Sequence, residues 1–404
     1  MRALEGITVL DLTHMLSGPY GTMLMADLGA RTIKVEPPGK GEGTRRLLEK
    51  SPDYARDGMG AYFLTLCRNK ESVAIDLKAE EGRALFYEMV RHADIVVSNF
   101  GVGVTERLKI DFATLSAHNP RIITCAISGF GETGPIRDWP SFDLVAQGMG
   151  GGMSLTGTEG SEYLRSGIPI GDLGGGMFGV IGILAALRAR DTTGKGQHVD
   201  ISMFDVQLSM LNYIGTMQLM SGKLTERVGN GHFVHVPYNT FHTRTRPLII
   251  AVITDNFWAT LVKLLEAPDL DRPEFAHQPG RYAQKDFIER RLNEIFATKT
   301  CEEWLALLET VRIPAAPVND VQQALAEPQT RARNMKVTVA LPGGGTVDQP
   351  GNPVKLSDTY EDIYTPPPRV GENTREVLAA MLGMGDARLK ELAARGVIDL
   401  GPKG

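Results

Sequence analysis

Short apolar runs alternate along the first half of the chain with segments whose apolar residues recur at helical spacing. ITVLDL (7–12) and RTIKVE (31–36) predict two strands, and the segment between them predicts a helix. The same order of strand, helix and strand returns over residues 72–99, and two further apolar runs occupy 121–128 and 198–202. Strands that alternate with helices in this way predict an α/β fold with a doubly wound, mainly parallel sheet.

The pattern changes after about residue 220, where a polar, turn-rich stretch, 222–247, precedes one strand and three predicted helices. A chain of 404 residues is too long for one ordinary core. We therefore expect residues 1–220 to form a large domain and residues 225–325 to form a smaller α/β domain. The remaining segment, 326–404, ends in two predicted short helices.

Composition and charge argue against several classes of protein. The hydrophobic fraction of 42% and the charged fraction of 23% are those of a soluble globular protein. The formal net charge of −5 gives no support for a nucleic-acid partner. The longest apolar stretch, 177–187, is short for a membrane span and is interrupted by glycines. The three cysteines form no disulfide or metal-ligand pattern and the N-terminus is unlike a signal peptide, so we expect a cytoplasmic protein without a membrane partner.

Basic residues gather in the first quarter of the chain, in contrast to the acidic net charge. They are Lys34, Lys40, Arg45, Arg46, Arg68, Lys70 and Lys78. This cluster predicts either a solvated charged face or a local site for a phosphorylated ligand, and the sequence leaves both interpretations open.

The stretch GIPIGDLGGGMFGV (167–180) holds one carboxylate, Asp172, among glycines. Where an extended segment meets a helix, an acidic residue is often an N-cap. Three glycines directly after a cap need a further reason, because each costs a helix about 1 kcal/mol relative to alanine. Gly174, Gly175 and Gly176 predict either tight helix packing or the close approach of a ligand. In the second case their amides are candidate oxyanion donors, and Asp172 is a candidate nucleophile or base.

The usual nucleotide-binding fingerprints are absent. The first strand–helix–strand unit lacks GxGxxG and the chain has no P-loop, which argues against an NAD-dependent enzyme. The glycine-dense segment 128–157 follows a strand, where open α/β sheets bind ligands, although a surface loop explains it equally well. His232, His235 and His242 lie in the polar stretch, and we expect surface histidines there and no metal site.

Several segments together resemble the class III coenzyme A (CoA) transferases, the CaiB–BaiF family that includes formyl-CoA and carnitine CoA-transferases. The resemblance covers nearly the whole chain, and its ordered set of segments is highly specific although no single segment is decisive. In chain order the segments are DLTHMLSGPYGTMLMADLGARTIKVEPP, RNKESVAIDLK, SNFGVGVTERLKID, SGFGETGP, GIPIGDLGGG, GKGQHVDISMFD, IPAAPVND and VGENTREVLAAMLG.

The resemblance implies a site, a set of partners and an assembly. The family's nucleophilic aspartate falls on Asp172. Its CoA contacts fall on His14, Ser17, Ile75, Lys78, Asn99, Phe100, Arg107 and Met203. CoA and acyl-CoA are then substrates, with no permanently bound cofactor. The implied fold is a ring-like, interlocked homodimer, in which each Rossmann-like large domain is built from both ends of a chain.

The implied reaction proceeds through covalent intermediates on Asp172. An ordinary aspartate, with a pKa near 3.9, is ionised at neutral pH and needs no base to act as a nucleophile. Asp172 attacks the acyl-CoA thioester to give an acyl-aspartyl anhydride and CoA thiolate. The thiolate then forms an aspartyl-CoA thioester and releases the donor acid, and an acceptor acid reverses these steps. We expect succinyl-CoA as donor and a small dicarboxylic acid as acceptor; Arg165 either binds the second carboxylate or anchors its own loop.

Two departures from the family bear on the substrate and the reaction. The family's NFRPG reads NFGVG here, and a glycine-rich loop of formyl-CoA transferase is replaced by HFVHVPYNTF, which argues against oxalate as the acceptor. α-Methylacyl-CoA racemases carry GHD where this chain has SFD, so Phe142 replaces a histidine base and cannot transfer a proton. We therefore expect CoA transfer. An acyl-CoA racemase or isomerase is the alternative within the family, and a non-catalytic acyl-CoA-binding protein is the alternative outside it.

Overall fold

The computed structural model describes residues 1–402, which divide into two compact units. The first unit contains residues 1–153, 165–222 and the chain from Arg331 onward, and the second contains 154–164 and 223–330. These limits lie close to the expected ones at 225 and 325. The segment 154–164 differs, because it belongs to the second unit and not to the large domain in which the sequence analysis placed it.

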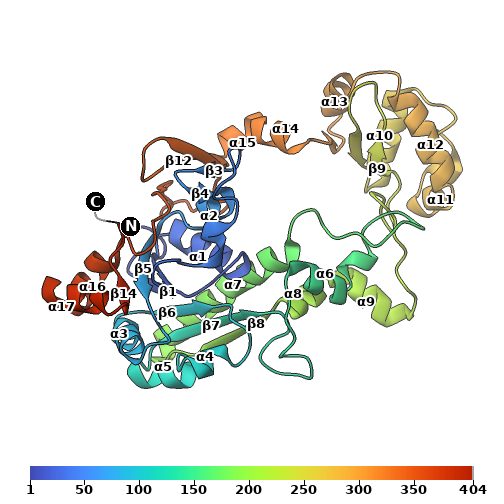
Figure 1. Cartoon of the computed structure of the whole chain (residues 1–404). Helices are drawn as coiled ribbons and strands as arrows, with labels where there is room; N and C mark the ends of the chain where they lie inside the picture. Colours follow the sequence, from blue (N-terminus) through green and yellow to red (C-terminus); the bar gives the residue numbers. More distant parts are fainter. Residues whose placement is uncertain (403–404) are drawn as a thin grey trace. The chain divides into compact units, whose positions relative to one another are not determined.

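The first unit is built on a mainly parallel sheet in the strand order β14-β5-β2-β1-β6-β7-β8 (Figure 1). Its strands are β1 (Thr8–Asp11), β2 (Arg31–Glu36), β5 (Lys70–Ile75), β6 (Ile95–Ser98), β7 (Ile123–Ser128), β8 (His198–Ser202) and β14 (Ile398–Asp399). β14 pairs antiparallel with β5, and the other neighbours pair in parallel. The predicted central strands are therefore confirmed to within two residues at their ends. β14 was not anticipated.

Helices cover both faces of this sheet, because alternate strand residues point to opposite sides. Leu10 and Ile33 pack with α3 (Glu80–Arg91), α5 (Phe112–His118), α16 (Thr374–Leu382) and α17 (Asp386–Ala394). Val9 and Ile123 pack on the other face with α1 (Ser17–Asp27), α7 (Ile170–Thr193) and α8 (Met203–Met210). The predicted doubly wound arrangement is confirmed for this unit.

Smaller elements complete the first unit. They are two short hairpins, β3 (Ala55–Arg56) with β4 (Met59–Gly60) and β12 (Lys336–Ala340) with β13 (Thr346–Pro350), and the helices α2 (Ala61–Leu66), α4 (Val104–Arg107), α6 (Asp143–Met149) and α9 (Asn212–Ser221).

The second unit has its own core and an antiparallel sheet in the order β11-β10-β9. Its elements are β9 (Tyr238–Phe241), β10 (Leu248–Ala251), α10 (Asp255–Leu265), α11 (Gln278–Ala283), α12 (Lys285–Phe296), α13 (Cys301–Thr310), β11 (Ala315–Pro317) and α14 (Val321–Ala326), with α15 (Pro328–Ala332) at its boundary. The predicted strand and three helices correspond to β10, α10, α12 and α13. β9 lies in the polar, turn-rich stretch 222–247, where the sequence pattern predicts no strand.

Four of the seven clustered basic residues of the first quarter, Lys34, Arg45, Arg68 and Lys70, are buried, which corrects both interpretations for these four. Lys34 and Arg68 are each 1% exposed. Arg45 pairs with Glu36, Arg68 with Asp27 and Lys70 with Asp11, at 2.6, 2.7 and 2.8 Å. Because carboxylates and the packed interior hold these four cations, they form neither a solvated face nor a phosphate site. Lys40, Arg46 and Lys78 are exposed, and for them both interpretations stay predictions.

The helix α7 is longer than the apolar stretch 177–187 suggested. It has 24 residues and, by length and composition alone, passes as a membrane span within the described chain. One such helix is weak evidence, because core helices pass the same test. In the first unit α7 packs against the sheet, and its buried Arg190 forms an ion pair with Asp94 at 2.9 Å. These features are typical of a core helix.

Candidate active site

Asp172 is the third residue of α7 and is not its N-cap, which is Pro169. The amides at the start of the helix are bound instead by a carboxylate from α6. The Oδ1 atom of Asp143 accepts hydrogen bonds from the amides of Gly171 at 2.8 Å and Asp172 at 3.3 Å. The N-cap interpretation of Asp172 is therefore wrong, and its carboxylate is left to face a cavity.

The three glycines after Asp172 let α7 pack closely on its neighbours. A Cβ atom on Gly176 would lie 2.5 Å from the carbonyl oxygen of Ser17, and one on Gly175 would lie 2.7 Å from the Ser17 hydroxyl. A Cβ atom on Gly174 would lie 2.9 Å from Val206. These glycines also lie beyond the first four amides of the helix, where each N–H normally binds a carbonyl one turn earlier. Packing therefore explains them, and their oxyanion role stays a prediction.

Asp172 lies in a cavity of about 870 Å³ in the first unit. Six of the eight CoA-contact residues implied by the resemblance line it as well: His14, Ser17, Asn99, Phe100, Arg107 and Met203. They come from loops and helices that follow β1, β6 and β8, so the cavity lies at the carboxyl edge of the sheet, where α/β proteins commonly bind ligands.

Ile75 and Lys78 lie outside this cavity. Ile75 is 2% exposed and belongs to the hydrophobic core, so only its backbone is suited to contact a ligand. Lys78 lies just beyond the carboxyl end of β5, on the same edge of the sheet.

Buried polar contacts hold the loop that carries His14 and Ser17. Lys34 donates to the carbonyl of Thr13 at 2.8 Å, and the amide of Thr13 donates to Asp11 at 2.9 Å. The backbone of His14 exchanges two hydrogen bonds of 2.7 Å with the side chain of Asn99. The hydroxyl of Ser17 is buried without a hydrogen-bond partner among the described residues. These bonds fix the course of the loop backbone, and the loop presents one unsatisfied hydroxyl beside α7.

The electrostatic environment of Asp172 differs from that of an ordinary aspartate. Burial, and after it the charge of Asp143, raise the pKa of Asp172 from 3.8 to about 6. The pKa near 3.9 expected from the sequence is therefore too low, although the carboxylate still predominates at pH 7 and above. Burial, and after it the charges of Asp172 and Asp143, also raise the pKa of Tyr62, which lines the cavity.

Sequence reasoning missed several residues of this cavity. Asp143 enters the sequence interpretation only as part of the SFD segment, and no sequence pattern indicates Tyr62, Arg137 or Trp139. Their distance from Asp172 in the sequence left no local pattern to find. Phe142 and Arg165, which were identified, do line the cavity, and the guanidinium of Arg165 donates to the carbonyl of Ser166 at 3.3 Å.

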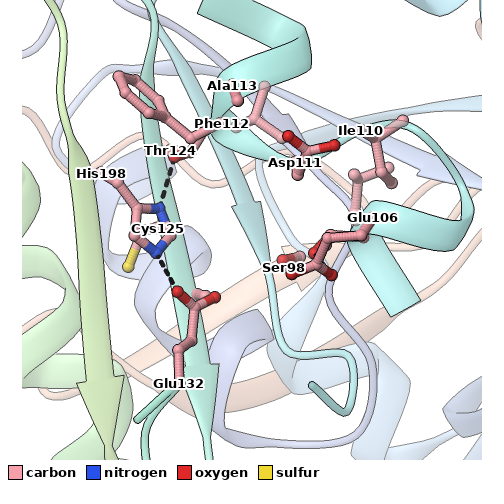
Figure 2. Close-up of a pocket in the computed structure, with 14 residues that line it drawn as sticks. Ser98, Glu106, Ile110, Asp111, Phe112, Ala113, Thr124, Cys125, Glu132 and His198 are labelled. Atoms are coloured by element: carbon pink, nitrogen blue, oxygen red, sulfur yellow. Dashed lines mark hydrogen bonds and ion pairs between the residues drawn. The ribbon is translucent and has the colours of Figure 1, made fainter. Parts of the chain in front are cut away.

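A second cavity of about 220 Å³ is lined by residues of β6, β7 and β8 and of the segment from α4 to α5 (Figure 2). It shares no lining residue with the first cavity. In it, His198 on β8 contacts Thr124 at 2.7 Å through Nδ1 and Glu132 at 2.8 Å through Nε2. The bond with Glu132 raises the pKa of His198 above its ordinary value. These contacts tie the loop after β7, which leads to Phe142 and Asp143, to the sheet.

Comparisons with known proteins show relatives that are CoA-transferases. A curated acetyl-CoA:oxalate CoA-transferase of Acetobacter aceti is 40% identical over 90% of this chain and 91% of its own. The succinyl-CoA:mesaconate CoA-transferase of Haloarcula hispanica is 36% identical over 96% and 99%. The human succinyl-CoA:glutarate CoA-transferase is 32% identical over 99% and 90%.

A solved structure extends the likeness to the fold. A CaiB/BaiF family protein of Brucella suis superposes with a TM-score of 0.84 and 34% identity, covering 94% of this chain and 99% of its own. The family description "CoA-transferase family III" matches residues 4–374. This coverage confirms the resemblance, and the chain belongs to CoA-transferase family III.

Proposed function

We propose that the protein transfers CoA from an acyl-CoA to a carboxylic acid, with Asp172 as the covalent carrier. The observation that supports this most directly is the position of Asp172. Its half-buried carboxylate opens into a large cavity that also contains six residues at the family's CoA-contact positions. A protein that only bound acyl-CoA would not need a carboxylate there.

The Asp172 carboxylate attacks the thioester carbon and the C–S bond breaks, which leaves an acyl-aspartyl anhydride and CoA thiolate. The thiolate attacks the Asp172 carbonyl, releases the donor acid and forms an aspartyl-CoA thioester. An acceptor carboxylate reverses both steps. Arg107 and Lys78 bind the phosphates of CoA, while the buried surroundings limit hydrolysis of the anhydride.

We expect small dicarboxylic acids as the exchanged substrates. Arg165 lines the cavity with Asp172, and its guanidinium has donors available for a second carboxylate. One relative is named as a succinyl-CoA:mesaconate CoA-transferase, and another as a succinyl-CoA:glutarate CoA-transferase. The 40% identical relative is named as an acetyl-CoA:oxalate CoA-transferase. The names of the relatives therefore do not decide whether oxalate is an acceptor.

Phe142 supports transfer over racemisation. It lines the cavity next to Asp143, and a phenyl ring cannot take up or release the α-proton of an acyl-CoA. Two-base racemisation therefore lacks one of its bases at this position.

We also propose the interlocked homodimer of the family and a cytoplasmic location. α7 and α9 expose apolar side chains that a second chain would cover, including Ile181, Tyr213, Leu219 and Met220. The three cysteines are free and buried, as is common in a reducing compartment.

One incubation with several acyl-CoAs and acceptor acids in deuterated water tests the proposal. A CoA adduct on the Asp172 peptide, with CoA moving to the acceptor, is expected. The matched variants Asp172→Ala and Asp172→Asn should bind CoA and form neither adduct nor product. Turnover in these variants would overturn the carrier role, and deuterium at the α-carbon without transfer would identify an isomerase.

A further inference from the structure

We propose that Asp143 is a positioning residue for CoA transfer: it binds the amides at the start of α7 and repels charge on Asp172, which favours the covalent states. This inference rests on the proposed carrier role of Asp172. It concerns a second carboxylate that takes no part in the bond changes themselves.

The contacts of Asp143 fix its position from two directions. Its Oδ1 atom accepts from the amides of Gly171 and Asp172, at 2.8 and 3.3 Å. Its Oδ2 atom accepts from the side chain of Gln147 at 2.8 Å, and Gln147 accepts from the amide of Ser166 at 2.9 Å. This chain of bonds ties α6 to both the start of α7 and the segment before it.

These donors are neutral amides, and no ion pair among residues 1–402 includes Asp143. A carboxylate held in this way has no paired cation beside it among the described residues of the cavity. It also uses helix amides that would otherwise stabilise a neighbouring anion. The resting site therefore contains two carboxylates, Asp143 and Asp172. The amides of Gly171 and Asp172 both bind Asp143.

The other ionisable groups of the cavity do not remove this effect. His14, Tyr62, Arg107, Arg137, Asp138 and Arg165 line the same cavity, from the β1 loop, α2, α4, the loop after β7 and the segment before α7. After burial, Asp143 is the charge that raises the pKa of Asp172.

Acylation removes the repulsion, because charge leaves Asp172 when it becomes covalently bound. The carboxylate oxygen forms a bond to the acyl carbon, the C–S bond breaks, and the negative charge departs on the CoA sulfur. The anhydride and the aspartyl-CoA thioester are both neutral at Asp172. Asp143 thus raises the free energy of the resting carboxylate relative to both intermediates, and one pKa unit of such repulsion corresponds to about a tenfold change in that equilibrium.

The double variant Asp143→Asn/Gln147→Glu separates charge from structure. The asparagine introduced on α6 can accept from both α7 amides and donate to the new glutamate one turn later. That glutamate can in turn accept from the amide of Ser166. The double variant can thus keep the four hydrogen bonds that join positions 143 and 147 to each other, to α7 and to Ser166. The negative charge moves from position 143 to position 147, further from Asp172. The single variant Asp143→Asn removes the charge entirely. It replaces the double variant in the same measurements if the double variant does not fold.

We expect both variants to lower kcat at pH 7.5 about tenfold and the KM for acyl-CoA to change less than about threefold. The acid limb of the kcat/KM profile should move to lower pH, and the steady-state CoA adduct on Asp172 should decrease. Wild-type kcat, pH profile and adduct in the double variant would overturn the inference, because a purely structural Asp143 predicts that result. Full turnover in Asp172→Asn would instead overturn the carrier role itself, which makes the two failures distinguishable.

Discussion

Lys70 and Asp11 form an ion pair of 2.8 Å with both side chains fully buried beneath the loop that carries His14 and Ser17. The hydroxyl of Thr22 donates to the same Asp11 oxygen at 2.9 Å, and the amide of Thr13 donates to the other at 2.9 Å. Burial is the largest single effect on Asp11 and raises its pKa. The cations of Lys34 and Lys70 together outweigh burial and hold the pKa of Asp11 well below its usual range. A buried charge pair thus anchors the first loop of the active site.

Removing one member of this pair should destabilise the protein strongly. Lys70→Met leaves Asp11 with less compensation, and we expect a loss of about 3 kcal/mol in the free energy of unfolding, with weaker CoA binding. The double variant Asp11→Asn/Lys70→Met should recover part of the loss. Urea unfolding at one protein concentration measures it, with the exposed Lys40→Met as the control. A change of under about 0.5 kcal/mol in Lys70→Met would contradict the anchoring role.

Asp172→Asn should make the protein more stable at neutral pH while abolishing transfer. The pKa of Asp172 is raised from 3.8 to about 6 on folding, so the folded protein binds this proton more tightly than the unfolded chain. The resulting stability is complete below about pH 4 and is lost as the pH rises through about 6. At pH 7.5 the asparagine variant should therefore be more stable by about 1 to 2 kcal/mol.

This difference should shrink toward zero as the pH falls to about 4, because the carboxyl of the folded wild-type protein is then protonated and as neutral as the asparagine amide. Unfolding curves of both proteins at pH 4.5 and 7.5 provide the measurement. An equal difference at both pH values would show that the effect comes from packing and not from ionisation.

Gly176→Ala should separate α7 from α1. The added methyl group would lie 2.5 Å from the backbone oxygen of Ser17 and 3.2 Å from the amide of Gly21, and backbone atoms cannot turn aside as a side chain can. We expect a loss of about 1 to 3 kcal/mol in stability and a reduced kcat, because Asp172 begins the same helix.

Gly148→Ala in α6 is the matched control, since its methyl group would lie at an ordinary 3.6 Å from Met153. That change should be neutral or stabilising, by up to about 1 kcal/mol. Similar melting temperatures for the two variants would show that close packing is not the reason for glycine at position 176.

Arg165→Ala should weaken dicarboxylic acceptors selectively. If the guanidinium binds the second carboxylate, the KM for succinate or glutarate should rise about tenfold, while that for a monocarboxylic acid of equal length should stay the same. Arg165→Lys should restore part of the preference, because it keeps the charge and loses the paired donors. An equal rise for both acids would indicate that Arg165 only orders its loop.

Local pattern determined much of this protein. The alternation of apolar runs with helical segments specifies the central strands β1, β2, β5, β6, β7 and β8, because burial on both faces of a parallel sheet requires near-continuous apolar sequence. Glycines around Asp172 indicated a crowded junction, and ordered motifs indicated the family. These features are written within short windows, so the sequence alone reveals them.

Only the tertiary structure decided what the charged residues do. Lys34, Arg68 and Lys70 look like solvent-exposed cations in the sequence, yet each is buried against a partner distant along the chain. Asp143 lies 29 positions before Asp172 and still binds its amide. Ion pairing and pKa depend on distance and burial in space, and no periodicity along the chain encodes either. The sequence thus indicates Asp172 as a candidate nucleophile, and the fold determines the environment that raises its pKa.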